Sequence, residues 1–168
     1  GAVEEVMTPY STEPPEEYRT EPYAHALASV IEKYKPEIML VGATAIGRDL
    51  GPRVSARVQT GLTADCTQLE IGDFPINPVA GKEQKHNQLL MTRPAFGGNT
   101  IATIACPDNR PQMATVRPGV MQKIAKIEGA KANVEEFNPG FTPDNKYVEI
   151  MEVVKSVSET VDIMDAKI

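Results

Sequence analysis

The clearest pattern along the chain is a short apolar run at residues 37–41, which has a proline before it and a glycine after it. A short run bounded by turn residues is typical of a fully buried strand in a parallel sheet. Beyond the glycine, aliphatic residues recur at a spacing of four, which predicts a helix over residues 49–59. Functional sites in such strand–turn–helix folds gather beyond the carboxyl ends of the strands, which directs attention to residues 42–48.

The rest of the chain alternates less regularly. Apolar residues on one face predict a helix over residues 20–34, with Thr20 as its N-cap and Pro36 beyond its end. We therefore predict an α/β fold, with a mainly parallel sheet flanked by helices and an antiparallel excursion over residues 88–118. The remaining extended runs predict strands at residues 3–7, 62–71, 88–93, 100–106, 112–117, 131–137, 147–157 and 161–168.

Composition limits the class of protein. The 168 residues suit one domain with a core, which must be mainly aliphatic because tryptophan is absent. The net charge of −6 argues against binding to nucleic acid, which needs a cationic surface. No apolar run approaches the roughly 20 residues that span a bilayer, and no signal peptide is visible at the start. We expect no membrane insertion.

Few side chains have the spacing of a reactive site. His25 and His86 lie far apart and lack the spacing of metal ligands, so we predict no metal site. Cys66 and Cys106 form no C-x-x-C pair and are too few for a disulfide framework. Buried, reduced thiols are the expected state, and that state indicates a cytoplasmic protein.

The turn after residues 37–41 has the glycine spacing of a phosphate-binding loop, G-x-x-x-x-G-K-[ST], at Gly42 and Gly47. However, Arg48 stands in place of the lysine, and Asp49 stands in place of the hydroxyl that would coordinate magnesium. A carboxylate at that position would repel phosphate. A structural turn is therefore favoured over a nucleotide-hydrolysing enzyme on an α/β fold, which is kept as an alternative.

Two arginines at predicted strand ends are the remaining candidates. Arg93 has the strand parity of Leu89 and Met91, so it would extend a buried face. Arg117 closes the run at 112–117. An arginine in this position needs a carboxylate, a phosphate or an electron-rich ring as its partner. From spacing alone, a surface ion pair is as well supported as a ligand contact.

At these residues the sequence resembles the alpha subunit of electron transfer flavoproteins, and in particular the bacterial and archaeal branch. Three stretches carry the resemblance and together cover about half of the chain. They are KPEIMLVGATAIGRDLGPRVSARVQTGLTADCTQLEI at 35–71, LLMTRPAFGGNTIATIACPDNRPQMATVRPGVM at 89–121, and the weaker YRTEPYAHALASVIEKY at 18–34. The resemblance implies a Rossmann-like α/β domain and a role in electron transfer rather than stand-alone catalysis.

The chain departs from the family at both ends. The first βα unit of the family would precede residue 1, and the C-terminal FAD domain would follow residue 168. We therefore expect residues 1–168 to be a single domain, most of the N-terminal α/β domain of the subunit. FAD is expected in the complete heterodimer and not bound tightly to this fragment alone.

The resemblance also implies partners and a site. The beta subunit of the family holds AMP or, in members that bifurcate electrons, a second FAD, and the resemblance places Arg93 near that flavin ring. Other implied partners are an acyl-CoA or lactate-type dehydrogenase and ferredoxin or flavodoxin. The alternative is a structural heterodimerisation module that touches no flavin. The expected cofactor-binding residues are Arg93, Pro94, Phe96, Gly97, Gly98, Asn99, Arg117, Thr44 and Arg48.

Overall fold

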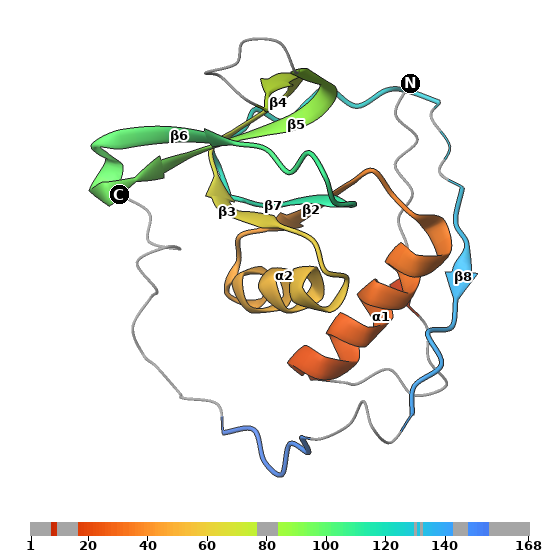
Figure 1. Ribbon diagram of the computed structural model, residues 1–168. Helices are drawn as coiled ribbons and strands as arrows, with labels where there is room; N and C mark the ends of the chain where they lie inside the picture. Colours follow the sequence, from red (N-terminus) through yellow and green to blue (C-terminus); the bar gives the residue numbers. More distant parts are fainter. Residues whose placement is uncertain are drawn as a thin grey trace.

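The computed structural model describes residues 8–9, 17–76, 84–129, 131, 133–142 and 148–154. The strands predicted at residues 3–7 and 161–168 lie outside the described residues. The described elements are β1 (Thr8–Pro9), α1 (Thr20–Tyr34), β2 (Ile38–Gly42), α2 (Ala45–Arg57), β3 (Leu62–Cys66), β4 (Gln68–Pro75), β5 (Gln84–Ala95), the 3-10 turn η1 (Phe96–Gly98), β6 (Thr100–Ile104), β7 (Gln112–Val116) and β8 (Glu136–Phe137) (Figure 1).

The predicted α/β class is confirmed. A three-stranded parallel sheet has the order β2-β7-β3, and a three-stranded antiparallel sheet has the order β4-β5-β6. Helices α1 and α2 lie on one side of the parallel sheet, and the antiparallel sheet lies on the other (Figure 1). The parallel sheet is therefore the middle layer of three.

Two predictions about the parallel sheet are wrong. The run at 112–117 was expected in the antiparallel excursion, but β7 is the central parallel strand and its first four residues are buried. The run at 37–41 was expected to be fully buried, but β2 pairs only with β7 among the described strands, and Leu40 is 52% exposed. Because β7 lies between β2 and β3, β2 is an outer strand of the described sheet. The antiparallel sheet packs mainly on β3, so it leaves Leu40 on β2 uncovered.

The predicted strand at 62–71 is two strands. The chain leaves the parallel sheet after Cys66 and enters the antiparallel sheet at Gln68, so Thr67 is the point of transfer. In the antiparallel sheet, β5 is longer than the predicted 88–93 and pairs with β4 on one side and β6 on the other. The run predicted as one strand at 62–71 therefore contributes β3 to the parallel sheet and β4 to the antiparallel sheet.

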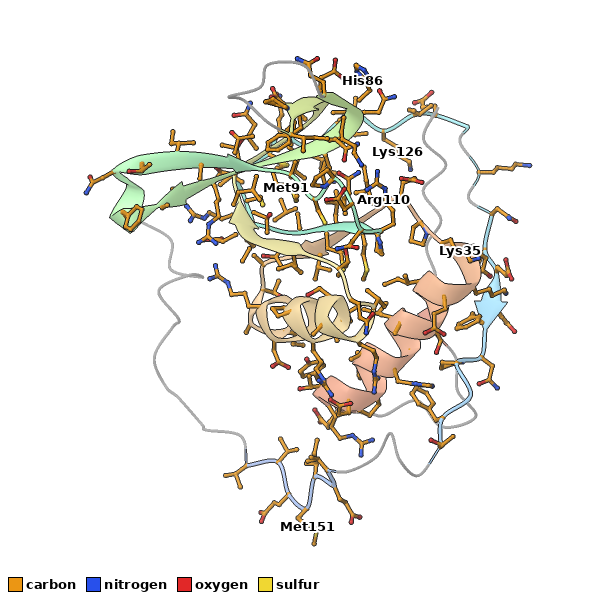
Figure 2. The ribbon with its side chains drawn as sticks, viewed as in Figure 1. Lys35, His86, Met91, Arg110, Lys126 and Met151 are labelled. Atoms are coloured by element: carbon orange, nitrogen blue, oxygen red, sulfur yellow. The ribbon has the colours of Figure 1, made fainter. Side chains whose placement is uncertain are left out.

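Alternation along β7 divides the core in two. Met113 faces the helices and is fully buried with Ala24, Ile31, Leu50 and Val54. The next residue, Ala114, faces the antiparallel sheet and is buried with Cys66, Leu89 and Met91. Met91 lies between the two sheets (Figure 2). Each face of β7 thus contributes to a separate apolar layer, as strand geometry requires.

The N-cap of α1 and the first residue of α2 differ from the prediction. The bounds 20–34 of α1 are confirmed, but its N-cap is Arg19, and the Thr20 hydroxyl instead donates to Asp49 Oδ2 at 2.6 Å. Helix α2 begins at Ala45 rather than at 49, because the Thr44 hydroxyl accepts a hydrogen bond from the Gly47 N–H at 3.1 Å. The turn after β2 is therefore shorter than the sequence indicated.

After Arg117 the described chain has little regular structure. Of the described residues in the strand predicted at 131–137, only those of β8 form a strand, which pairs in parallel with β1. Residues 148–154, the described part of the strand predicted at 147–157, form none. The Lys33–Glu135 ion pair, at 2.7 Å, ties this segment to α1. Among the described residues, no helix combines the length and the apolar character needed to cross a membrane.

Candidate functional site

The predicted residues Thr44, Arg48 and Arg117 gather at the carboxyl edge of the parallel sheet. Thr44 and Arg48 follow β2, and Arg117 follows β7. Because all three strands run in parallel, their carboxyl ends meet at one edge. Two backbone bonds hold this edge together: the Ala43 N–H donates to Val116 O at 2.7 Å, and the Arg117 N–H donates to Cys66 O at 2.9 Å. The sequence pattern directed attention to residues 42–48, and this edge is where Thr44 and Arg48 of that segment lie with Arg117.

Near the end of β3, on this edge, lies Asp65, which the sequence analysis missed. It sits where the pairing of β3 with β7 shifts register between Thr63 and Cys66, and its φ is +61°. Aspartate is among the few residue types that adopt this left-handed conformation readily. The Asp65 N–H donates to Thr115 Oγ1 at 2.8 Å, which fixes the bulge. The signal that could have found it was an aspartate inside a predicted strand, where it is disfavoured.

Asp65 binds two of the predicted arginines. Arg117 donates from Nε to Oδ1 at 3.1 Å and from Nη2 to Oδ2 at 2.6 Å, a two-pronged pair. Arg48 donates from Nη2 to Oδ1 at 3.2 Å and from Nε to the Ala43 carbonyl at 2.9 Å. The hydrogen bonds from Arg117 hold the pKa of Asp65 below its ordinary value, with further help from the charges of Arg48 and Arg93. Asp65 is therefore ionised in the folded protein.

Arg93 approaches the same edge from β5. It lies on the face of that strand that carries Leu89 and Met91, which are 4% and 1% exposed. Burial raises the pKa of the Cys66 thiol, and the positive charge of Arg93 opposes that rise, so the guanidinium lies within electrostatic reach of both Cys66 and Asp65. Its Nε is enclosed and has no acceptor among the described residues. The surface ion pair that spacing allowed is absent from the described part of the chain.

The residues that follow Arg93 form the exposed tip of the β5–β6 hairpin. Phe96 is 84% exposed, and Phe96, Gly97 and Gly98 all have positive φ. A Cβ built on either glycine would have no atom within 4 Å. Pro94 still belongs to β5, and Asn99 ends the turn. None of the hydrogen bonds of the described residues joins this tip to Asp65. Of the arginine cluster, which consists of Arg48, Arg93 and Arg117, Arg93 lies on the same hairpin as the tip.

The edge is cationic in a protein that is acidic overall. Arg48, Arg93 and Arg117 carry three positive charges around the carboxylate of Asp65, against a net charge of −6 for the chain. Opposite charges within a few ångströms cancel much of each other's field. The uncompensated positive charge at this edge therefore attracts an anionic or electron-rich group.

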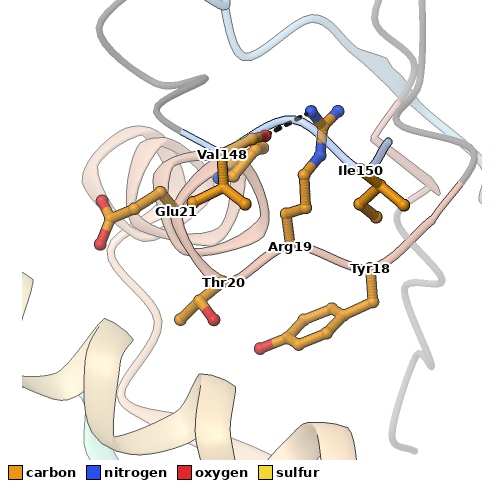
Figure 3. A pocket seen from close by; sticks show the side chains of 7 residues that line it. Tyr18, Arg19, Thr20, Glu21, Val148 and Ile150 are labelled. Carbon is orange, nitrogen blue, oxygen red and sulfur yellow. Dashed lines mark hydrogen bonds between the residues drawn. The ribbon is translucent and has the colours of Figure 1, made fainter. Parts of the chain in front are cut away.

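A separate cavity of about 330 Å³ lies at the start of α1, far along the chain from the arginine cluster. It is lined by Tyr18, Arg19, Thr20, Glu21, Pro22, Val148 and Ile150. Arg19 donates to the Val148 carbonyl at 3.0 Å (Figure 3). Glu21 accepts from Arg53 and Arg57 on α2. The Nε of Arg19 is enclosed without an acceptor among the described residues, as is that of Arg93. The cavity nevertheless carries one arginine and one paired carboxylate, whereas three arginines meet at the sheet edge, so the sheet edge is the stronger candidate for binding an anionic group.

Comparison with known proteins finds one family model and several related sequences. A sequence model described as the electron transfer flavoprotein domain matches residues 10–141. The chain is 48% identical over 151 residues to Protein FixB of Clostridium saccharobutylicum, which covers 90% of this chain and 42% of that protein. It is 44% identical over 151 residues to electron transfer flavoprotein subunit alpha of Thermoanaerobacterium thermosaccharolyticum, with the same coverage.

A third relative is the acryloyl-CoA reductase electron transfer subunit beta of Anaerotignum propionicum. It is 44% identical over 165 residues, which is 90% of this chain and 45% of that protein. The chain therefore spans less than half the length of these curated relatives.

Proposed function

Because the chain belongs to the electron transfer flavoprotein family, we propose that it forms most of the N-terminal α/β domain of an alpha subunit. In this proposal residues 1–168 are one domain, which pairs with a beta subunit. The pair passes electrons between a flavin and a partner dehydrogenase. The family match over residues 10–141 and the α/β fold support the domain assignment.

One observation carries the site assignment: Arg93 has a partly buried guanidinium without a carboxylate partner in the described part of the chain. A buried donor without an acceptor is costly, so such groups have partners in functional assemblies. The net positive charge of the edge fits FAD, whose ring gains negative charge on reduction. When bound, the flavin supplies the redox chemistry, and the protein supplies orientation and electrostatics.

The chain's own residues then have distinct roles. Arg93 holds a permanent positive charge beside the flavin of the beta subunit and favours its reduced form. The cofactor-binding set also includes Arg117 and Arg48, which are bound to Asp65, and Thr44, which caps α2 at the same sheet edge. The hairpin tip brings Pro94, Phe96, Gly97, Gly98 and Asn99 toward the partner subunit; its exposure and its positive-φ glycines allow a close approach.

We propose the type of the partner dehydrogenase and not a particular enzyme. A relative that carries acryloyl-CoA reductase in its name supports an acyl-CoA type, and the family resemblance adds a lactate type and ferredoxin or flavodoxin. Electron bifurcation is a property of part of the family. A cytoplasmic location, expected from the two unpaired cysteines, stays a prediction.

The test is Arg93→Ala in the complete heterodimer. Loss of a positive charge that favours the reduced flavin should lower the reduction potential of the flavin held by the beta subunit. A tenfold change in a one-electron equilibrium corresponds to about 59 mV, and a shift of this order is expected. The measurement is a spectroelectrochemical titration, with flavin occupancy determined separately from the absorbance of the released cofactor.

Arg110→Ala is the matched control. Arg110 lies at the opposite end of β7, where it pairs with Glu37 at 2.6 Å, so its removal changes the net charge equally but away from the cluster. It should leave the potential unchanged. If Arg93→Ala also leaves both potential and occupancy unchanged, the flavin role is wrong and the structural heterodimerisation module is the better account.

A further inference from the structure

Asp65 accepts hydrogen bonds from two of the three nearby arginines and none from the third. It accepts two hydrogen bonds from Arg117 and one from Arg48, at 2.6 to 3.2 Å. It accepts none from Arg93, although that guanidinium lies within reach of its field. The carboxylate is 19% exposed, so water screens these interactions only in part. Two guanidiniums are thus held by the carboxylate and partly neutralised, and the third makes no hydrogen bond to it.

The position of Asp65 is built into the backbone. Its φ of +61° and the shift of register between Thr63 and Cys66 turn the carboxylate away from the strand direction. The bond from its N–H to Thr115 Oγ1, at 2.8 Å, ties it to the central strand. A residue placed by a bulge in this way is typical of strand ends that re-aim a side chain at a site. An ordinary ion pair on a regular strand would not need that arrangement.

We propose that Asp65 is a positioning residue that holds Arg117 and Arg48 in place and cancels part of their charge, so that Arg93 is the one guanidinium of the three that is not bound to the carboxylate and is presented to the flavin. This proposal rests on the function proposed above. Asp65 touches no reacting atom in this scheme; it acts through the arginines. Its charge opposes theirs, so its removal should affect the flavin in the direction opposite to the removal of Arg93.

The experiment uses the complete heterodimer with Asp65→Asn and Asp65→Gly. Asparagine and glycine both adopt a positive φ readily, so both variants suit the backbone, and both remove the negative charge. The one-electron equilibrium should shift about threefold to tenfold toward the reduced flavin, a rise of about 28 to 59 mV in potential. A steric effect would differ between the two side chains, whereas a charge effect gives both variants the same sign.

The double variant Asp65→Asn with Arg117→Gln tests the compensation. It restores the net charge of the wild-type edge, because it removes one negative and one positive charge. Its potential should return close to the wild-type value, although the lost ion pair lowers the free energy of unfolding. A residue with only a structural role would change stability in all these variants without raising the potential.

The outcomes separate the two proposals. If Arg93→Ala lowers the potential but both Asp65 variants leave it unchanged or lower it, the role of Asp65 is wrong and the flavin assignment stands. If the double variant shifts as far as Asp65→Asn alone, charge compensation by Asp65 is likewise wrong. If Arg93→Ala itself has no effect, the flavin assignment fails, and the role of Asp65 falls with it.

Discussion

Replacement of Gly47 by alanine is the sharpest test of how the site is assembled. Gly47 lies in the first turn of α2, where its N–H binds the Thr44 hydroxyl. A Cβ at Gly47 would stand 1.9 Å from the Gly42 carbonyl oxygen and 3.0 Å from Val41 Cγ1. Helix α2 can therefore approach the end of β2 this closely only because position 47 has no side chain. The same approach positions Arg48 one residue later.

The expected change in the free energy of unfolding of Gly47→Ala follows from the contact between the added Cβ and the Gly42 carbonyl oxygen. Side-chain Cβ atoms essentially never lie within 3.0 Å of another atom, so the helix end or the Gly42 carbonyl must move by at least 1.1 Å. Overpacking against backbone costs about 3 kcal/mol, because the carbonyl cannot rotate away as a flexible side chain would. Alanine regains about 1 kcal/mol of helix propensity over glycine. The free energy of unfolding should therefore fall by about 2 kcal/mol.

Urea unfolding of the chain, followed by far-UV circular dichroism, measures the change. The matched control is Gly42→Ala, where the nearest atom to an added Cβ is Thr44 Cγ2 at 3.9 Å. The control should change the free energy of unfolding by less than about 0.5 kcal/mol. Equal stability of the two variants would refute the close approach of α2 to β2, and with it the placement of Arg48 beside Asp65.

Two further predictions concern the core and the site. Met113→Ala should lower the free energy of unfolding by about 3 kcal/mol, since Met113 is fully buried on the central strand. Met121→Ala, at an exposed methionine, is the control in the same urea assay. An equal loss of stability in the two variants would contradict the assigned core. Asp65 has a folded pKa below its ordinary value of 3.8, so its stabilisation is complete above that value and is lost as the pH falls through the folded pKa. The stability difference between wild type and Asp65→Asn should therefore shrink from about pH 5 down to about pH 2, and a constant difference would show that the carboxylate charge is not what stabilises the edge.

Local sequence determined the helices and the region of the site. The bounds of α1 could be predicted because its apolar face repeats at the helical period and Pro36 stops it. The turn from β2 into α2 could be located from its glycines, although the start of the helix depended on the Thr44 cap. These features depend on residues within a few positions of each other, which a linear pattern records.

The tertiary structure alone decided the strand order and the composition of the cluster. Nothing local to residues 112–116 indicates that β7 inserts between β2 and β3, because that choice depends on which strands compete for the centre of the sheet. Asp65 was missed for the same reason: its partners, Arg48 and Arg117, are 17 and 52 positions away in the sequence. Periodicity reports which face of an element is apolar, whereas partners distant in sequence meet only after the sheet has formed.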